Sequence, residues 1–170
     1  PISLNKEEVL KAMVSSSTIP YLDGTGEYME KGYVALDHNG SAASLTLEYA
    51  YDDWTIYHTA LLAGNRSVAD TYKKRAVNYE NVFDTNIGYA RPRYADGRWK
   101  ENFNLLSTHG EGFIEGNALN YSFYVPQDVN NMIRLMGGEK SFVSKLDSLF
   151  TMHLPAEFFA QTEDVTEEGL

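Results

Sequence analysis

Between Ser44 and Leu62 the apolar and aromatic side chains recur at spacings of three and four. That period places them on one face of an α-helix. Gly64 follows the run, where a residue that adopts positive φ ends many helices. We therefore predict a helix over residues 44–62, with one face formed by Leu47, Ala50, Tyr51, Trp54, Tyr57, His58 and Leu61.

The same period predicts further helices along most of the chain. One lies near Lys6–Ser15 and another spans Val68–Phe83. Two more follow Pro126, separated by the Gly137-Gly138 pair, with apolar faces made by Val129, Met132, Ile133 and Met136 and then by Phe142, Leu146, Leu149 and Phe150.

Two long segments interrupt the helices, at Ile19–Gly40 and Asp84–Asn117. The second holds Gly88, Pro92 and the hairpin signal Asp96-Gly97. Loops beyond about 12–15 residues are uncommon unless they carry function. Paired helices with long loops favour an all-α chain that forms part of an α/α-toroid over residues 1–170, with no second domain. No fixed-period repeat is visible in the sequence, which disfavours solenoid folds. The acidic tail from Gln161 to Leu170 is expected to fray.

Charge and composition exclude several classes of protein. The 14 Lys and Arg residues against 24 Asp and Glu give a net charge of −10, which repels nucleic acids and anionic membranes. Hydrophobic residues make up 43% of the chain, enough for a globular core. The absence of cysteine excludes disulfides, thiol nucleophiles and Cys-based metal sites. No apolar run approaches the ~18 residues that cross a bilayer.

The sequence carries no phosphate-binding glycine loop, no His-Glu-x-x-His and no Gly-x-Ser-x-Gly motif. Its four histidines, which we interpret as packing or surface residues, lack metal-ligand spacing: His38, His58, His109 and His153.

Acidic residues instead gather among aromatic ones. Glu48 and Asp52 are one helical turn apart beside Tyr51 and Trp54. Because like charges at that spacing destabilise a helix, they should face water, a cation or a sugar. A solvated helix face is the alternative.

A second cluster surrounds Glu115, which lies between Ile114 and Gly116 and just ahead of a helix. A carboxyl held among aromatic groups has a raised pKa, as a general acid requires; the alternative is that Glu115 caps the helix. Nearby, Arg91 and Arg93 could bind substrate oxygens, or anchor the loop by ion pairs.

Several motifs, in order and at similar spacing across residues 30–155, resemble glycoside hydrolase family 92. They are Thr46-Leu47-Glu48-Tyr49-Ala50-Tyr51-Asp52-Asp53-Trp54, Gly88-Tyr89-Ala90-Arg91-Pro92-Arg93, Glu115-Gly116-Asn117-Ala118, Val125-Pro126-Gln127-Asp128 and Leu135-Met136-Gly137-Gly138. The resemblance implies a calcium-dependent, inverting exo-α-mannosidase, often α-1,2-specific, with a β-sandwich followed by an (α/α)6 catalytic domain. This chain resembles the middle of that toroid, and it departs from the motif at Leu119-Asn120, where the family commonly has Trp-Gln.

The resemblance also implies roles for particular residues. Glu115 corresponds to the general acid. The paired aspartates that act as base lie in a motif expected beyond Leu170, and no calcium ligand can be assigned within the chain. We expect the substrate pocket to involve Asp52, Asp53, Trp54, Arg91, Arg93, Asn117 and Tyr121.

The expected partners are an α-mannoside of a mannan or N-glycan and the remainder of the parent chain. The chain begins without Met, which suggests excision from something longer. An isolated fragment is expected to lack activity and to self-associate through unpartnered helix faces. The resemblance suggests a bacterial periplasmic, secreted or cell-surface enzyme. Another (α/α)6 glycosidase, or a non-catalytic carbohydrate-binding or scaffold module, remains the alternative.

Overall fold

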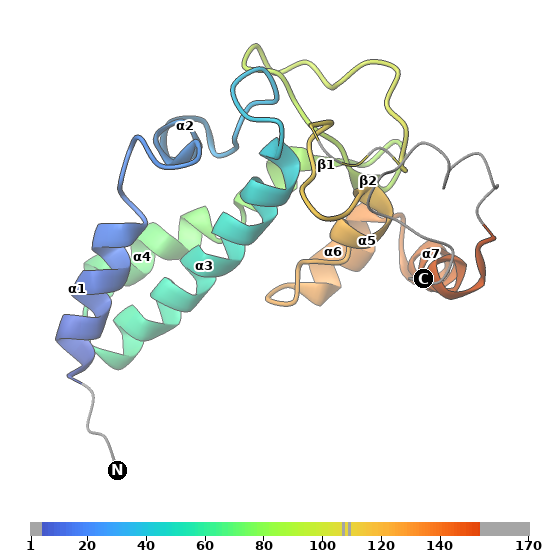
Figure 1. Ribbon diagram of the computed structural model, residues 1–170. Coiled ribbons are helices and arrows are strands. Elements are labelled where there is room, and N and C mark those ends of the chain that lie inside the picture. Colours follow the sequence, from blue (N-terminus) through green and yellow to red (C-terminus); the bar gives the residue numbers. More distant parts are fainter. Residues whose placement is uncertain (1–4, 107, 109, 154–170) are drawn as a thin grey trace.

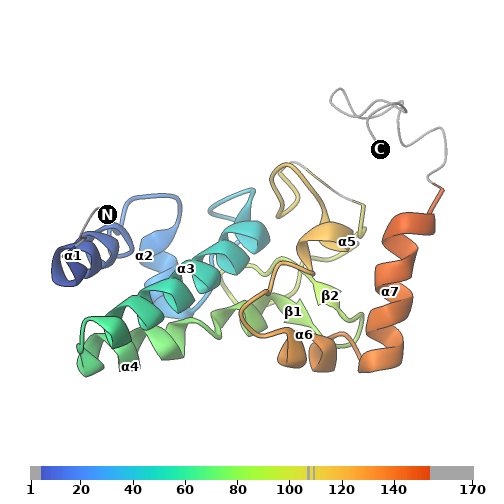
Figure 2. The same cartoon turned by 90° about the horizontal axis from the view of Figure 1, so that it is seen from below.

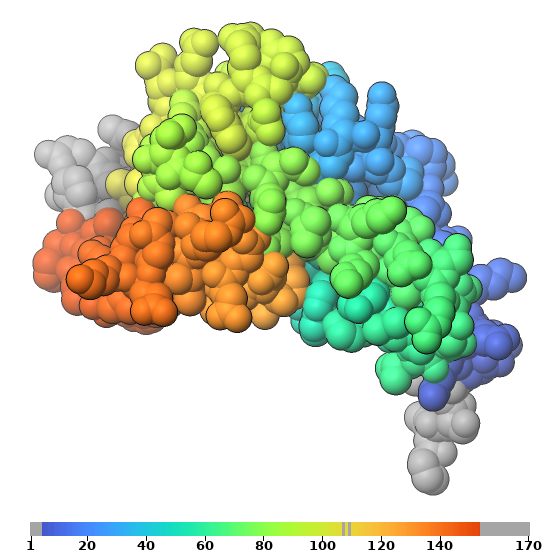
Figure 3. All heavy atoms as spheres, turned by 180° about the vertical axis from the view of Figure 1, so that it is seen from behind, coloured from blue at the N-terminus to red at the C-terminus, as the bar shows by residue number. Residues whose placement is uncertain are grey.

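The computed structural model describes residues 5–106, 108 and 110–153. They form an elongated body, with α1 and α4 at one end and α7 at the other (Figures 1 and 3). In chain order the elements are α1 (Lys6–Ser16), α2 (Thr25–Lys31), α3 (Ala42–Leu62), α4 (Arg66–Arg75), the 3-10 helix η1 (Asn78–Val82), β1 (Phe83–Asp84), β2 (Tyr89–Ala90), α5 (Ala118–Tyr121), α6 (Val129–Leu135) and α7 (Glu139–Thr151). None of the described helices is long and apolar enough to span a membrane.

The longest helix, α3, runs diagonally from the end that holds α1 and α4 toward the middle of the structure (Figures 1 and 2). Its 21 residues confirm the predicted helix, but the predicted apolar face is only partly right. Leu47 and Ala50 are buried together with Asp53, Ile56 and Ala60, whereas the predicted His58 and Leu61 are exposed. Gly64 follows its cap in the left-handed region, at φ 75°, and donates its N–H to the Leu61 carbonyl. A glycine adopts that φ without the steric cost of a Cβ, so the chain can turn directly into α4.

At its C-terminal end α3 packs between α1 and α4. The small core there is made by Leu10, Ile56, Ala60, Ala69 and Tyr72. The helix over Lys6–Ser16 confirms the prediction for the N-terminus, and Asn5 caps it by accepting the N–H groups of Glu7 and Glu8.

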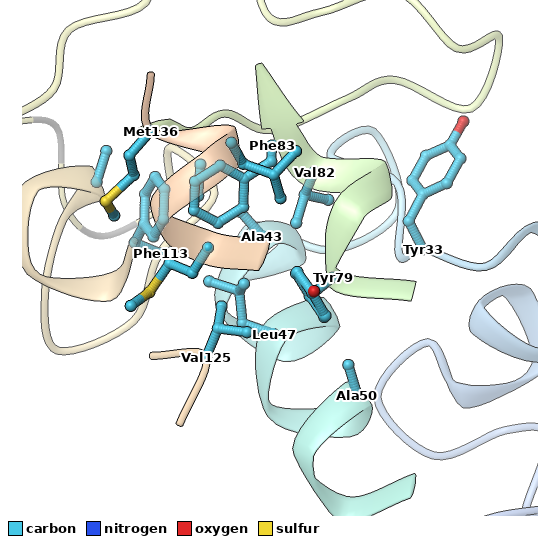
Figure 4. Close-up of a cluster of buried hydrophobic side chains, with 14 of the residues drawn as sticks. Tyr33, Ala43, Leu47, Ala50, Tyr79, Val82, Phe83, Phe113, Val125 and Met136 are labelled. Carbon is cyan, nitrogen blue, oxygen red and sulfur yellow. The ribbon is translucent and has the colours of Figure 1, made fainter. Parts of the chain in front are cut away.

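The larger core lies at the N-terminal end of α3, where the helix meets η1, the β strands, α5 and α6 (Figure 4). Alanine and leucine on α3 face aromatic and aliphatic residues that come from several other segments of the chain. These residues include Ala43, Leu47, Ala50, Tyr79, Val82, Phe83, Phe113, Val125 and Met136.

The helix predicted over Val68–Phe83 is wrong in its second half. It ends at Arg75, and a 3-10 turn and β1 follow. The sequence pattern extended past Arg75 because Tyr79 and Phe83 are buried in the larger core. Buried positions are apolar in any backbone conformation, so these two residues imitate the period of a helix.

The expectation of structureless loops also needs correction. The Ile19–Gly40 segment contains α2, which begins and ends at Gly24 and Gly32, both with φ near 80°. Its seven residues are too few to show a clear period, and Tyr28 anchors it by complete burial. The four-residue α5 lies just beyond the other predicted loop.

Two tight turns confirm the predicted hairpin region. Phe83 pairs with Ala90 and Asp84 with Tyr89 in an antiparallel sheet. A bridge between Arg93 and Trp99 then closes around the Asp96-Gly97 turn. The described residues are otherwise helical or irregular, and the predicted all-α partial toroid is confirmed. The predicted fraying of Gln161–Leu170 falls outside the described residues.

The outer helix α7 generates a prediction about association, because none of its residues is buried. Its Phe150 and Val143 side chains are 82% and 52% exposed. Exposed apolar groups on an amphipathic helix favour contact with another chain. Light scattering across a concentration series should show a mass above that of one chain, and Val143→Ser with Phe150→Ser should lower it.

The matched control is Lys140→Ser with Asp147→Ser, which alters two exposed polar residues of the same helix at no net charge change. That variant should associate like the unmodified chain. A monomer at every concentration would contradict the prediction.

Candidate functional site

The loop that carries Glu115 is fixed to the beginning of α3. The Gly112 carbonyl accepts the N–H groups of Ala43 and Ser44 at 2.9 and 3.2 Å, and the Gly112 N–H donates to the Gly40 carbonyl. A Cβ on Gly112 would lie 2.0 Å from the Pro92 ring, so only glycine permits this close packing. The following Phe113 is fully buried.

Glu115 occupies an exposed turn between this anchor and α5. Its φ is 53°, in the left-handed region that few non-glycine residues adopt. Its expected burial among aromatic groups is not seen, because Phe113 and Tyr121 pack on neighbouring parts of the loop and leave the Glu115 side chain exposed.

The alternative that Glu115 caps the helix is also not what the structure shows. Asn117 is the N-cap of α5, and Asn120 completes a capping box by accepting the Asn117 N–H at 2.8 Å. Asn120 therefore performs the role that Glu or Gln has in a capping box. Leu119, the other departure from the family motif, is buried.

Tyr121 connects the Glu115 loop with α3. Its hydroxyl donates to the Glu48 carboxylate at 3.0 Å, across 73 residues of sequence. Burial, followed by the charge of Glu48, raises the pKa of Tyr121 to about 12, with a further contribution from Glu115. The hydroxyl is therefore a hydrogen-bond donor throughout the physiological range.

An aromatic stack continues along the same side of α3. Tyr51 lies parallel to Trp54, with 5.8 Å between ring centroids, and Tyr124 contacts Tyr51 edge-on. The His58 ring packs against the Trp54 ring, with 4.4 Å between their centroids, as expected of a packing histidine. Burial raises the pKa of Tyr124, and Glu48, Tyr51 and Asp52 add to the effect.

These contacts define one surface, which we call the acidic–aromatic face. It combines three carboxylates with four aromatic rings, and it consists of Glu48, Tyr51, Asp52, Trp54, Glu115, Tyr121 and Tyr124. Four predicted site residues belong to it. Glu48, Tyr51 and Tyr124 were not assigned to the site, although the spacing of Glu48 and Asp52 had indicated this side of the helix.

Asp53 lies elsewhere, although it directly follows Asp52. It is 1% exposed and pairs with the Arg75 guanidinium through two contacts of 2.9 Å. Tyr28 donates to the same carboxylate at 2.7 Å, and Arg75 also bonds the Ser17 carbonyl. Asp53 therefore joins α2, α3 and α4, and its carboxylate is engaged by Arg75 and Tyr28.

The contacts of Arg91 and Arg93 support the alternative that these two residues anchor the loop. Arg91 pairs with Asp84 at 2.9 Å and donates to the Lys100 carbonyl. Arg93 lies between the rings of Tyr33 and Trp99, with its guanidinium carbon 5.2 and 4.7 Å from their centroids. These contacts hold the loop that packs on Gly112.

A cavity of about 460 Å³ adjoins the acidic–aromatic face at Asp52. Its border position partly desolvates Asp52, which raises the pKa of that carboxyl. The cavity lies among α1, the segment leading into α2, α3 and Arg75. Its wall is largely apolar, with Ala12, Met13, Leu22 and Ile56 beside Asp52 and Asp53.

The described residues hold no group of three or more His, Asp or Glu side chains arranged to bind a metal ion. Ca²⁺ takes six to eight oxygen ligands, often from several carboxylates. The described part of this chain therefore does not fit a complete calcium site.

Comparison with known proteins gives a family match over nearly the whole chain. The family model described as "Glycosyl hydrolase family 92 catalytic domain" matches residues 3–168. A curated relative from the fungus Arthroderma benhamiae, described as an uncharacterized secreted glycosidase, is 29% identical over 128 residues, covering 62% of this chain and 16% of the relative.

Solved structures are similar in both sequence and fold. The family GH92 α-mannosidase BT3965 from Bacteroides thetaiotaomicron is 34% identical, with a TM-score of 0.86 over 91% of this chain and 20% of that structure. The inverting mannosidase BT2199 from the same organism is 28% identical, with a TM-score of 0.83 over 95% of this chain and 23% of its own. The chain thus spans about a fifth of these proteins.

The contrast between the adjacent acids leads to a stability prediction. Asp53→Ala should lower the free energy of unfolding by about 3 kcal/mol, because it leaves Arg75 without its buried partner. Asp52→Ala should change it by less than about 1 kcal/mol, because Asp52 is exposed. Denaturant unfolding of both variants measures the difference, and equal losses would contradict the assignment.

Asp53 also makes the free energy of unfolding depend on pH. Burial raises its pKa to about 6, against the lowering effect of Arg75 and Tyr28. Since the folded state binds this proton more tightly than the unfolded state, the Asp53 contribution increases stability as pH falls through 6.

Between pH 7 and pH 5 the increase should be about 1 kcal/mol, and Asp53→Asn should remove it. Urea unfolding of both proteins at the two pH values isolates this contribution, because the other carboxylates titrate in both. Identical pH profiles would contradict a raised pKa at Asp53.

Proposed function

Because the chain belongs to glycosyl hydrolase family 92, we propose that its parent enzyme hydrolyses terminal α-linked mannose with inversion and that Glu115 is the general acid. The names of the relatives support the reaction: BT3965 is an α-mannosidase with a mannoimidazole complex, and BT2199 is an inverting mannosidase. The observation that carries the role of Glu115 is its exposed position on a fixed turn beside the acidic–aromatic face.

In this proposal the Glu115 carboxyl donates its proton to the glycosidic oxygen as the bond to the anomeric carbon breaks. A carboxylate on the opposite side of the sugar activates water, at a separation of ~6.5–9.5 Å that leaves room for the water molecule. We assign that base to the aspartate pair that the family resemblance implies for a separate motif.

The acidic–aromatic face suits a carbohydrate in its mixture of groups. The Tyr51 and Trp54 rings offer apolar surfaces for the C–H face of a sugar, and the exposed Asp52 carboxylate can accept hydrogen bonds from its hydroxyl groups. We propose Asp52, Trp54 and Tyr121 as substrate-contacting residues. Asn117 supports them by capping α5.

Calcium belongs to the proposal through family membership alone. The described residues do not provide its ligand set, and no step above uses it. We propose α-1,2-linked mannose of mannans or N-glycans as the substrate, and a bacterial periplasmic or extracellular location. The description of the fungal relative as secreted agrees with a location outside the cytoplasm.

The role of Glu115 predicts a dependence on the leaving group. In the full-length enzyme, Glu115→Gln should lower kcat on α-1,2-mannobiose by ~10²–10⁴-fold, because it removes general acid catalysis. An aryl mannoside with a dinitrophenolate leaving group needs little protonation and should lose much less. Mannose release and dinitrophenolate absorbance measure the two rates.

Asp70→Asn provides a matched control, since it neutralises an exposed carboxylate on α4, away from the acidic–aromatic face. It should leave both rates unchanged. Equal losses on both substrates in Glu115→Gln would remove Glu115 from the acid role.

A further inference from the structure

We propose that Glu48 is a positioning residue for Glu115 and acts through Tyr121; this inference rests on the proposed acid role of Glu115. The hydrogen bond from the Tyr121 hydroxyl to the Glu48 carboxylate joins α5 to α3 at 3.0 Å. A hydrogen bond to an ionised acceptor is stronger than one between neutral groups. Glu48 thus fixes the outer end of the Tyr121 side chain.

The ring of Tyr121 in turn packs against the backbone next to Glu115. A Cβ on Gly116 would lie 2.9 Å from the Tyr121 ring carbons Cδ2 and Cε2, closer than real side chains permit. The ring also packs against Phe113, with centroids 5.9 Å apart. Tyr121 therefore contacts the loop on both sides of Glu115.

Glu115 depends on this support because its own conformation is unfavourable. A non-glycine residue at φ 53° persists only where surrounding contacts impose it. Within the described part of the chain the Glu115 carboxyl makes no hydrogen bond, so the backbone of the turn sets its direction. A displacement of about 1 Å in such a group can reduce a catalytic rate by about a hundredfold.

Loop mobility tests the structural half of the proposal. In the full-length enzyme, amide hydrogen exchange across residues 113–121 should accelerate about tenfold or more in Glu48→Ala and in Tyr121→Phe, since each removes one partner of the hydrogen bond. Glu48→Gln keeps a carbonyl acceptor and should stay near the unmodified rate. Asp52→Ala, one turn away on α3, controls for the loss of a carboxylate and should not alter this exchange.

Kinetics test the second half. Glu48→Ala should lower kcat on α-1,2-mannobiose by about 10–100-fold with little change in KM, and the dinitrophenyl mannoside should be less affected. Glu48→Gln should recover most of the rate. The Glu48→Ala, Tyr121→Phe double variant should lose no more than Tyr121→Phe alone, because the contribution of Glu48 passes through the Tyr121 hydroxyl.

Each outcome bears on a separate claim. Unchanged exchange in Glu48→Ala, or a kcat loss that Glu48→Gln does not recover, would overturn the positioning role. A raised KM in Glu48→Ala that Tyr121→Phe does not reproduce would also overturn it, and would assign Glu48 to direct substrate contact. If Glu115→Gln instead leaves mannobiose hydrolysis unchanged, the proposed acid fails, while the exchange rates still report whether Glu48 holds the loop.

Discussion

The buried pair of Asp53 and Arg75 is the contact on which the arrangement of the first four helices depends. Two short contacts join the carboxylate to the guanidinium, and Tyr28 and the Ser17 carbonyl bring α2 and the end of α1 to the same point. Burial of the Asp53 charge is costly, so it requires this set of partners around it. The position of α3 relative to its neighbours follows from it.

Because this contact fixes α3, another side of the helix can expose the carboxylates and aromatic rings of the acidic–aromatic face. Successive residues of a helix are rotated by about 100°, so the Asp53 carboxylate turns to its buried partners while Asp52 stays exposed on the acidic–aromatic face. Glu48, one turn earlier, holds Tyr121. The same helix thus anchors the fold through one carboxylate and supports the Glu115 turn through another, and the two functions are separated by helical geometry alone.

Periodicity predicted α1, α3, α6 and α7 because each is an amphipathic helix with a regular apolar face. It did not find α2 or α5, whose few residues are stabilised by distant contacts. The sequence motifs proposed Glu115 and Asp52 for the site together with Asp53, Arg91 and Arg93, and the last three make structural contacts in the fold. Their partners, Arg75, Asp84 and aromatic rings, are identified only by the folded backbone.

The central claim is that this segment delivers the acid Glu115 to a mannoside from a fixed turn. A crystal structure of the full-length enzyme with mannoimidazole, the ligand of a BT3965 complex, tests it most directly. The account predicts the Glu115 carboxyl at ~2.6–3.2 Å from the ligand atom that replaces the glycosidic oxygen, with Glu48 bonded to Tyr121. A different carboxyl at that atom, with Glu115 turned toward solvent, would contradict it.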